Sequence, residues 1–383
     1  MSEIYLDYNA TTPVLPEVLE AMLPFYREGF GNPSSSHATG RRAQQAVDLA
    51  REQVAALLHC APSEVVFTSC ATESNNAAIK GVAAALARKG NHIITTKAEH
   101  PSVLYPALHL EKAGYRVTCL EVDDEGMFDP ADLEKTITPE TILISVMLAN
   151  NETGTIFPVG AVGEIAARHG VYLHCDAVQA VGKIAVDCRE LQAGLVSLSG
   201  HKLYAPKGVG ALVVRQGIRL QPLLHGGGQE KNRRSGTENV AGIVALGQAS
   251  AIALGSGAAE AARVRELRDR LERGILEAIS GVRRNGHPTR RLGNTLSLTF
   301  SGLPSDSLVG ALDRLGIAVS SGSACSSGAL KSAAADGCTQ EAHLRFSLGR
   351  FSTGADVDTV LDILPGLVES LRCEAGGDRG ACR

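Results

Sequence analysis

The sequence predicts an α/β protein with a mostly parallel β-sheet in a larger domain, followed by a smaller α+β domain. Strand-like and helical segments alternate over about the first two hundred residues, as in right-handed βαβ units. The chain has 383 residues, which is longer than a domain with a single compact core usually is, so two domains are expected. Far along the chain, residues 295–300 alternate apolar and polar side chains, which is typical of an antiparallel strand in a second sheet.

The spacing of apolar residues places the elements in order. Val47, Ala50, Val54 and Leu58 recur at helical spacing, and an alanine-rich stretch from about residue 241 to 279 is expected to contain the connecting helices. Further helices are expected at 72–86 and 307–315, and strands at 65–67, 92–94, 142–146, 171–173, 195–198 and 209–214. The domain boundary is placed near residue 258.

Composition and charge exclude several classes of protein. Hydrophobic residues make up 44% of the chain and charged residues 20%, as in an ordinary globular protein. The net charge is -4 and the arginine pairs are scattered, so nucleic acid is not an expected partner. The N-terminus has no basic stretch followed by an apolar core, and no segment approaches the roughly 18 apolar residues that cross a bilayer. These features predict a cytoplasmic enzyme.

The cysteines indicate a reducing compartment. There are nine, an odd number, and none are in Cys-x-x-Cys spacing, so neither a complete disulfide framework nor a standard zinc site is expected. Most, such as Cys60 and Cys175, lie in or beside apolar segments. Cys325 instead lies among small polar residues, where it is either an incidental loop cysteine or a reactive thiol.

An acid and a lysine stand at the ends of two expected strands. Asp176 closes one apolar run and Lys202 follows another, and pyridoxal phosphate needs both an acid beside its ring nitrogen and an amine for a Schiff base. A surface lysine is the simpler explanation for Lys202, and Lys207 is a rival that follows a proline in an expected turn. Gly200 and the glycines after Lys202 favour a tight loop that a cofactor can approach.

A phosphate site is expected where residues 68–76 leave a strand and enter a helix. The amides near Ala71 and Thr72 would point at an anion at the helix N-terminus, and Thr72 would add a hydroxyl. A plain helix cap is the alternative. Ser199 and His201 beside the lysine favour the phosphate, because donors from two strand ends can converge on one site.

These motifs resemble the cysteine desulfurases of the NifS and IscS type, among the class V aminotransferase-like, fold-type I pyridoxal phosphate enzymes. The sequences of residues 68–74 and 149–154 are more similar to the NifS branch of this family than to its housekeeping branch. The matches cover nearly the whole chain, at residues 5–13, 31–35, 68–76, 99–101, 150–154, 174–179, 199–202, 234–239, 321–325 and 345–350.

The resemblance implies the PLP-dependent transferase fold type I and a homodimer. The large domain, residues 16–258, would contain a mostly parallel seven-stranded sheet flanked by helices. Residues 1–15 and 259–383 would form the smaller domain, with the catalytic cysteine on a mobile loop at about 320–338.

The resemblance also implies roles for single residues. Lys202 would hold pyridoxal 5'-phosphate as a Schiff base and move the substrate Cα proton, and Asp176 would keep the ring nitrogen protonated. His100, otherwise a helix-entry histidine, would stack on the ring and assist proton transfer. Arg345 would clamp the substrate carboxylate, with a structural role for Arg350.

Further implied contacts surround the cofactor and the substrate. Gln179 and Asn151 would bind the phenolic oxygen and the substrate side of the site. The phosphate would be held by Ala71, Thr72, Ser199 and His201, joined by Thr237 from the neighbouring subunit.

The implied reaction converts L-cysteine to L-alanine. The Cys325 thiolate would attack the substrate sulfur and carry it as a persulfide to an iron-sulfur scaffold protein of the NifU or IscU kind. The catalytic residues would be Lys202, Cys325 and His100. A selenocysteine lyase, a carbon-sulfur lyase or an aminotransferase on the same fold is the alternative, and a non-enzymatic sulfur-relay subunit is a third.

The segment after Cys325 departs from the family pattern. Residues 330–338 lack the Glu-Pro-Ser motif of similar proteins, so the loop is expected to be shortened. Cys338 is then either a second thiol or a small loop residue.

Overall fold

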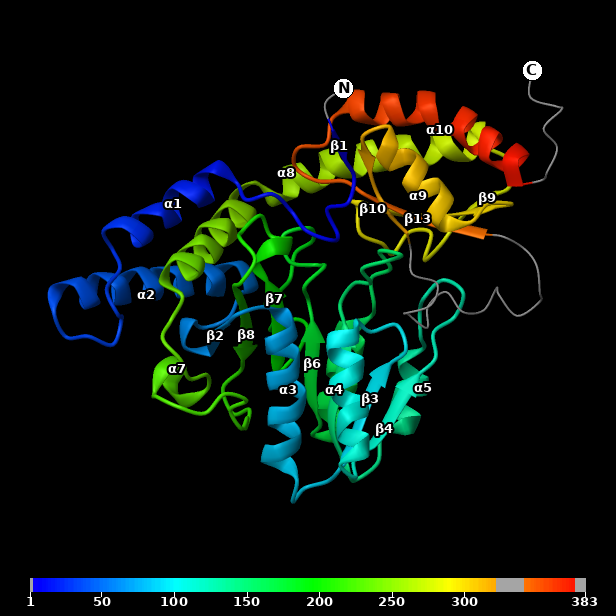
Figure 1. Ribbon diagram of the computed structural model, residues 1–383. Helices are drawn as coiled ribbons and strands as arrows, with labels where there is room; N and C mark the ends of the chain where they lie inside the picture. Colours follow the sequence, from blue (N-terminus) through cyan, green and yellow to red (C-terminus); the bar gives the residue numbers. More distant parts are fainter. Residues whose placement is uncertain (1–2, 322–340, 376–383) are drawn as a thin grey trace.

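The structure, a computed structural model, describes residues 3–321 and 341–375. Its elements form two lobes, each with its own sheet, and one long helix runs through both (Figure 1). Cys325 and Cys338 lie outside the described residues, and so does most of the expected catalytic loop.

The larger lobe contains a seven-stranded sheet in the order β2-β8-β7-β6-β5-β3-β4. Strands β3 to β7 run parallel, and β8 is antiparallel to both of its neighbours, which confirms the mostly parallel sheet. The strands are β2 (Val65–Thr68), β3 (His92–Thr96), β4 (Arg116–Leu120), β5 (Thr141–Met147), β6 (Tyr172–Asp176), β7 (Leu195–Ser199) and β8 (Gly210–Val214). Strand β4 was not expected, because this edge strand is partly exposed and lacks a clear apolar pattern.

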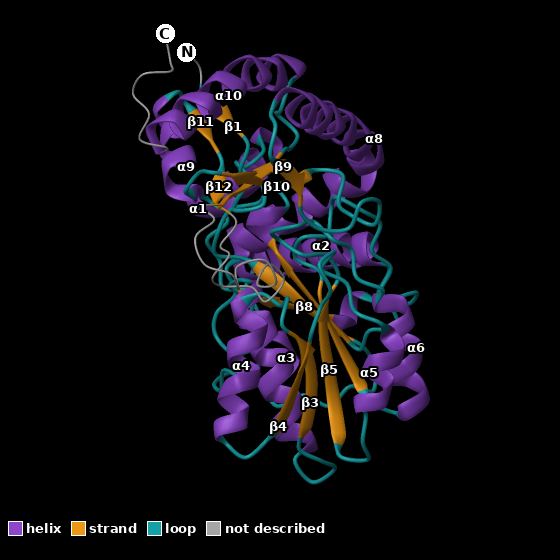
Figure 2. Cartoon of the chain, turned by 90° about the vertical axis from the view of Figure 1, so that its right-hand side faces the viewer, coloured by secondary structure: helices purple, strands orange, loops and turns teal. Residues whose placement is uncertain are grey.

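Helices cover both faces of this sheet. Helices α3 and α4 lie on one face, and α5 and α6 lie on the other (Figure 2). Separate apolar clusters fill the two faces, one centred on α3 and one shared by α2, α6 and α8. The helices of this lobe are α1 (Pro16–Arg27), α2 (Ala38–Leu58), α3 (Ala71–Leu86), α4 (Pro101–Lys112), α5 (Pro130–Thr136), α6 (Val159–His169) and α7 (Gln229–Asn232), with 3-10 turns η1 (Pro62–Glu64) and η2 (Gly200–Lys202).

The smaller lobe is built on a four-stranded antiparallel sheet in the order β12-β13-β10-β9. The expected strand at 295–300 is its β10, which confirms that prediction. Near the N-terminus, β1 pairs in parallel with β11, so the start of the chain belongs to this lobe. The elements are β1 (Ile4–Tyr5), β9 (Val282–Arg284), β10 (Thr295–Ser301), α9 (Ser305–Arg314), β11 (Ile317–Ala318), β12 (Ser320–Ser321), β13 (Glu341–Ser347) and α10 (Gly354–Ala375).

One continuous helix, α8 (Val240–Ala278), replaces the several connecting helices that were expected. Its residues up to Ala249 pack in the core of the large lobe, and those from Val264 pack in the core of the small lobe. The proposed domain boundary near residue 258 therefore falls inside a helix. By length and composition alone, α8 is the one helix of the described part long and apolar enough to cross a membrane, although no such segment was expected. The helix packs against α1, α2 and α10, and its apolar residues contribute to the cores of the two lobes.

Candidate active site

A cavity of about 350 Å³ opens where the parallel strands of the large sheet end. Nearly all of the expected cofactor and substrate contacts line it, from both lobes of the chain. They are Ala71, Thr72, His100, Asn151, Asp176, Gln179, Ser199, His201, Lys202 and Arg345. Thr237 is exposed and does not line this cavity in the single chain.

Two neighbouring strands bring the acid and the lysine together. Strand β6 ends at Asp176 and strand β7 ends at Ser199, and the two strands are paired in parallel. The η2 turn after β7 then directs Lys202 to the same edge. A Cβ atom at Gly200 would lie 2.8 Å from Val209 Cγ1 and 3.0 Å from Val209 O, so only glycine permits this close approach.

The start of α3 is suited to binding a phosphate. The helix begins at Ala71, and the side chain of its N-cap residue Cys70 accepts no capping hydrogen bond, which leaves first-turn amides available to an anion. The buried Ser199 Oγ also has no hydrogen-bond partner within the described part of the chain. These unpaired donors fit the dianion that the sequence predicted at this position.

An ion pair neutralises the one acid in the first turn of α3. Glu73 accepts hydrogen bonds from Arg234 Nε at 2.8 Å and from the Ser69 amide at 2.8 Å. These contacts hold the pKa of the Glu73 carboxyl below its usual range, against the opposing effect of burial. A negative charge beside the phosphate site is therefore compensated, a contribution of Arg234 that the sequence did not reveal.

A chain of hydrogen bonds links His100 to Asp176. Asn75 Nδ2 donates to Asp176 Oδ2 at 2.8 Å and to Ser102 Oγ at 2.9 Å. Ser102 Oγ lies 2.7 Å from His100 Nδ1, which also accepts from the Ser102 amide at 3.1 Å. Because Nδ1 is an acceptor, the proton of the neutral imidazole resides on Nε2. Burial lowers the pKa of His100, which favours that neutral form.

Asp176 is a buried carboxyl, and no cationic side chain among residues 3–321 and 341–375 forms an ion pair with it. Burial raises its pKa, and hydrogen bonds from the Val178 amide and from Asn75 oppose that effect. A protonated ring nitrogen at this position would supply the missing positive charge. The carboxyl therefore fits a pyridinium cofactor.

Lys202 is enclosed and its amine is easily deprotonated. Burial, followed by the charge of Arg345, lowers the pKa of Lys202 to about 8. Its Nζ donates to Ala10 O at 2.7 Å and to Asn9 O. A neutral amine attacks a carbonyl carbon, so this lowered pKa suits a lysine that forms a Schiff base. Lys207 is exposed, as expected of a residue in a turn.

Arg345 reaches the cavity from β13 of the small lobe. Its guanidinium donates to Asp7 Oδ1 at 2.8 Å and to Asn151 O at 2.9 Å, while no described residue accepts from the buried Nε. Arg350 has a different environment, because it pairs with Glu260 of α8 and lies over the Tyr204 ring. Arg345 is thus the arginine of this segment that is placed to bind a carboxylate in the cavity.

The donors of the cavity match pyridoxal phosphate as a set. Ala71 and Thr72 at the start of α3, with Ser199 and His201, would hold the phosphate, Asp176 would face the ring nitrogen, and Lys202 would supply the amine. Sequence reasoning missed Asn75 and Ser102, which connect these groups. The sequence signal that could have revealed them is a polar side chain at a position that the helical spacing of α3 or α4 buries, because a buried polar group needs a hydrogen-bond partner.

Comparisons with known proteins identify the family of this chain. The family model described as "Aminotransferase class-V" matches residues 4–360. "Cysteine desulfurase 2" of Trichormus variabilis is 49% identical over 378 residues, which cover 97% of this chain and 94% of the relative. "Cysteine desulfurase IscS" of Methanosarcina thermophila is 48% identical over 375 residues, which cover 96% of this chain and 93% of the relative.

Solved structures show the same fold. A "NIFS-LIKE PROTEIN" superposes with a TM-score of 0.91 at 38% identity, covering 96% of this chain and 100% of that chain. A structure titled "SspA in complex with cysteine" has a TM-score of 0.78 at 34% identity, covering 91% of this chain and 100% of that chain.

Proposed function

Because the chain belongs to the class-V aminotransferase family and is a pyridoxal phosphate-dependent cysteine desulfurase, we propose that the Lys202 cavity is its active site. The observation that carries this assignment is the convergence of Lys202, Asp176 and Arg345 on one cavity from segments far apart in the chain. Cys325 is the proposed acceptor of the substrate sulfur.

The residues of the cavity bind and orient the cofactor. When bound, pyridoxal phosphate supplies an electron sink for the substrate. Thr72, Ser199 and His201 hold the phosphate together with the α3 amides. Asp176 would stabilise the positive charge of the ring nitrogen, and Gln179 would donate to the phenolic oxygen.

Two side chains move protons. The Lys202 amine accepts the Cα proton of the substrate, because its pKa of about 8 leaves a sizeable neutral fraction near neutral pH. His100 presents Nε2–H to the cavity, since Ser102 occupies Nδ1. The Cys325 thiolate attacks the substrate sulfur, the Cβ–S bond breaks as the S–S bond forms, and alanine is released after protonation.

Arg345 binds the substrate carboxylate. We expect Arg345→Lys to raise the KM for L-cysteine by about 10- to 100-fold, because a lysine cannot replace the two parallel hydrogen bonds of a guanidinium. Steady-state kinetics of alanine formation measure this effect. Arg350→Lys is the matched control and should lower the melting temperature with little change in KM. Equal KM values for the Arg345 variant and the wild type would contradict the assignment.

The site is proposed to be completed by a second copy of the chain. Thr237 lies outside the cavity of its own subunit and is exposed, so it is free to contact the phosphate of a partner subunit. The segment before it is held in shape by Glu230, which accepts from Arg51 Nη2 at 2.7 Å and from the Phe67 amide at 3.0 Å. Light scattering of the purified protein tests the dimer.

The sulfur acceptor is proposed to be an iron-sulfur scaffold protein of the NifU or IscU kind. Support comes from the IscS name of several relatives. A cytoplasmic location is also proposed, on the odd number and the spacing of the cysteines in the sequence. Transfer of labelled sulfur from the loaded enzyme to a purified scaffold tests the acceptor.

A direct assay tests the proposed function. Incubation with L-cysteine is expected to yield alanine and protein-bound sulfane sulfur in equal amounts in the first turnover, without any keto acid. Mass spectrometry of the protein and amino-acid analysis measure the two products. Alanine formation that requires a keto acid and leaves no sulfane sulfur would instead indicate an aminotransferase.

A further inference from the structure

We propose that Lys183 is a positioning residue that holds the amide of Gln179 in the orientation required by the phenolic oxygen of the cofactor. This inference deepens the proposed function and rests on it, because the contact between Gln179 and the cofactor belongs to that proposal. Lys183 takes no part in the steps described above.

The Lys183 amine lies between two amide oxygens. Its Nζ donates to Gln179 Oε1 at 2.6 Å and to Asn9 Oδ1 at 3.2 Å. Among the described residues no carboxylate forms an ion pair with it. Burial, and then the charges of Lys202 and Arg345, lower the pKa of Lys183 well below its usual range. A lysine without an ionic partner is costly in such a place, and a purely structural role would be served better by an apolar side chain.

The hydrogen bonds of Gln179 leave one orientation for its buried amide. Gln179 Nε2 donates to Asn9 O at 3.0 Å, and a main-chain oxygen can only accept, so the amide nitrogen must face it. Oε1 then faces Lys183, which supplies the donor. The second hydrogen on Nε2 remains for the cavity that Gln179 lines. Without Lys183, Oε1 would be a buried acceptor with no donor, and the side chain would lose the contact that holds this rotamer.

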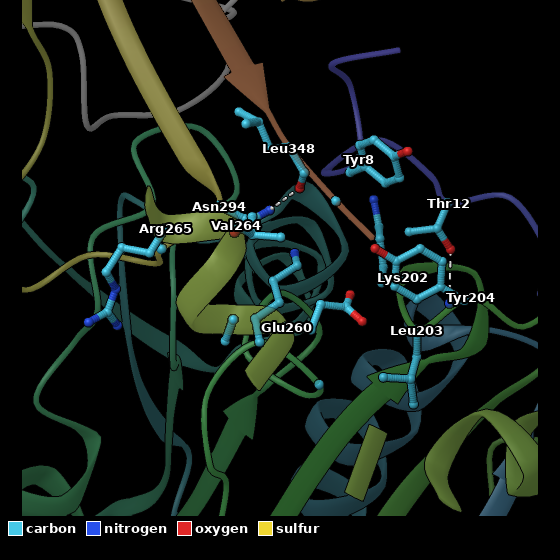
Figure 3. A pocket seen from close by; sticks show the side chains of 15 residues that line it. Tyr8, Thr12, Lys202, Leu203, Tyr204, Glu260, Val264, Arg265, Asn294 and Leu348 are labelled. Carbon is cyan, nitrogen blue, oxygen red and sulfur yellow. Dashed lines mark hydrogen bonds between the residues drawn. The ribbon is translucent and has the colours of Figure 1, made fainter. Parts of the chain in front are cut away.

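Asn9 connects this pair to the catalytic lysine. Its Oδ1 accepts from Asn294 Nδ2 at 2.9 Å as well as from Lys183, and its main-chain oxygen accepts from both Lys202 and Gln179. Lys183 and Lys202 line a second, small cavity of about 40 Å³, on which Figure 3 shows Lys202 together with Asn294. Lys183 therefore holds Gln179 on the side away from the main cavity, and both side chains bond to Asn9, which also accepts from Lys202.

A double-mutant cycle tests the inference. The variants are Lys183→Met, Gln179→Leu and the two combined, and the measurements are the Kd of the apo-protein for pyridoxal phosphate and the visible absorbance of the complex. Lys183→Met alone is expected to weaken binding about tenfold, the effect of losing one buried hydrogen bond, and to shift the absorbance maximum. In the Gln179→Leu background, Lys183→Met should change the Kd by less than about twofold, because the amide that Lys183 positions is gone.

Controls separate positioning from folding. Lys183→Arg keeps the donors and is expected to restore the wild-type absorbance maximum. A second cycle uses Lys183→Leu in place of Lys183→Met, so the test can still be completed if one of the two variants fails to fold. An equal loss of affinity in both backgrounds, or an unchanged Kd and spectrum in Lys183→Met, overturns the inference. A wild-type protein that binds no pyridoxal phosphate overturns the proposed function itself.

Discussion

Replacing Lys202 by alanine is expected to lower the rate of alanine formation by about 10⁴-fold or more and to remove the visible absorbance of lysine-bound cofactor. The loss is large because one amine both attaches the cofactor and moves the substrate proton. The described lysines that are nearest along the chain or in space offer no substitute, since Lys207 is exposed and Lys183 is bonded to Gln179 and Asn9.

Absorbance spectra of the purified variant, recorded after incubation with pyridoxal phosphate, measure this effect. Lys207→Ala serves as the matched control and should retain the band. A Lys202→Ala protein with an unchanged band would show that another amine holds the cofactor.

For Cys325→Ala we expect a protein that keeps the cofactor absorbance but forms no persulfide from L-cysteine. Cys325 lies outside the described residues, so this prediction rests on its small, polar sequence surroundings and on the position of the catalytic cysteine in the family. The cofactor contacts lie elsewhere in the chain, which is why binding should be unaffected. Loss of persulfide separates attachment of the cofactor from acceptance of the sulfur.

Cys70 provides the control for this experiment. It is a free thiol that lines the Lys202 cavity, which makes it the rival sulfur acceptor among the described cysteines. Cys70→Ala is expected to form persulfide, and Cys338→Ala shows whether the second thiol after Cys325 contributes. Persulfide at the wild-type level in Cys325→Ala, located on Cys70 by peptide mapping, would refute the role given to Cys325.

The sheet and the main cavity residues could be predicted from the sequence because they depend on local patterns. Asp176 and Ser199 close apolar runs that had to be buried strands, and parallel strands place their carboxyl ends at one edge. The start of α3 was predicted in the same way, from a strand followed by an alanine-rich helix. Such signals lie within a few residues of the side chain that they place.

The supporting contacts could not be predicted, because they join segments that are distant in the chain. Asn9 donates to Thr295, 286 residues away, and Asn75 reaches Asp176 across 101 residues. Neither pairing leaves a local pattern, since even a polar side chain that the helical spacing buries does not reveal which distant residue it contacts. The unbroken α8 was also missed, because Gly255 and Gly257 near its middle have low helical propensity and its apolar face changes partner between the two lobes.

The most direct test is to reduce the purified wild-type protein with borohydride after adding pyridoxal phosphate, and then to map its peptides by mass spectrometry. Reduction makes the bond between lysine and cofactor permanent. We predict a pyridoxyl group on the peptide that contains Lys202, in an amount close to one per chain. A pyridoxyl group found mainly on Lys183, Lys207 or another lysine, or none at all, would contradict the assignment of the active site.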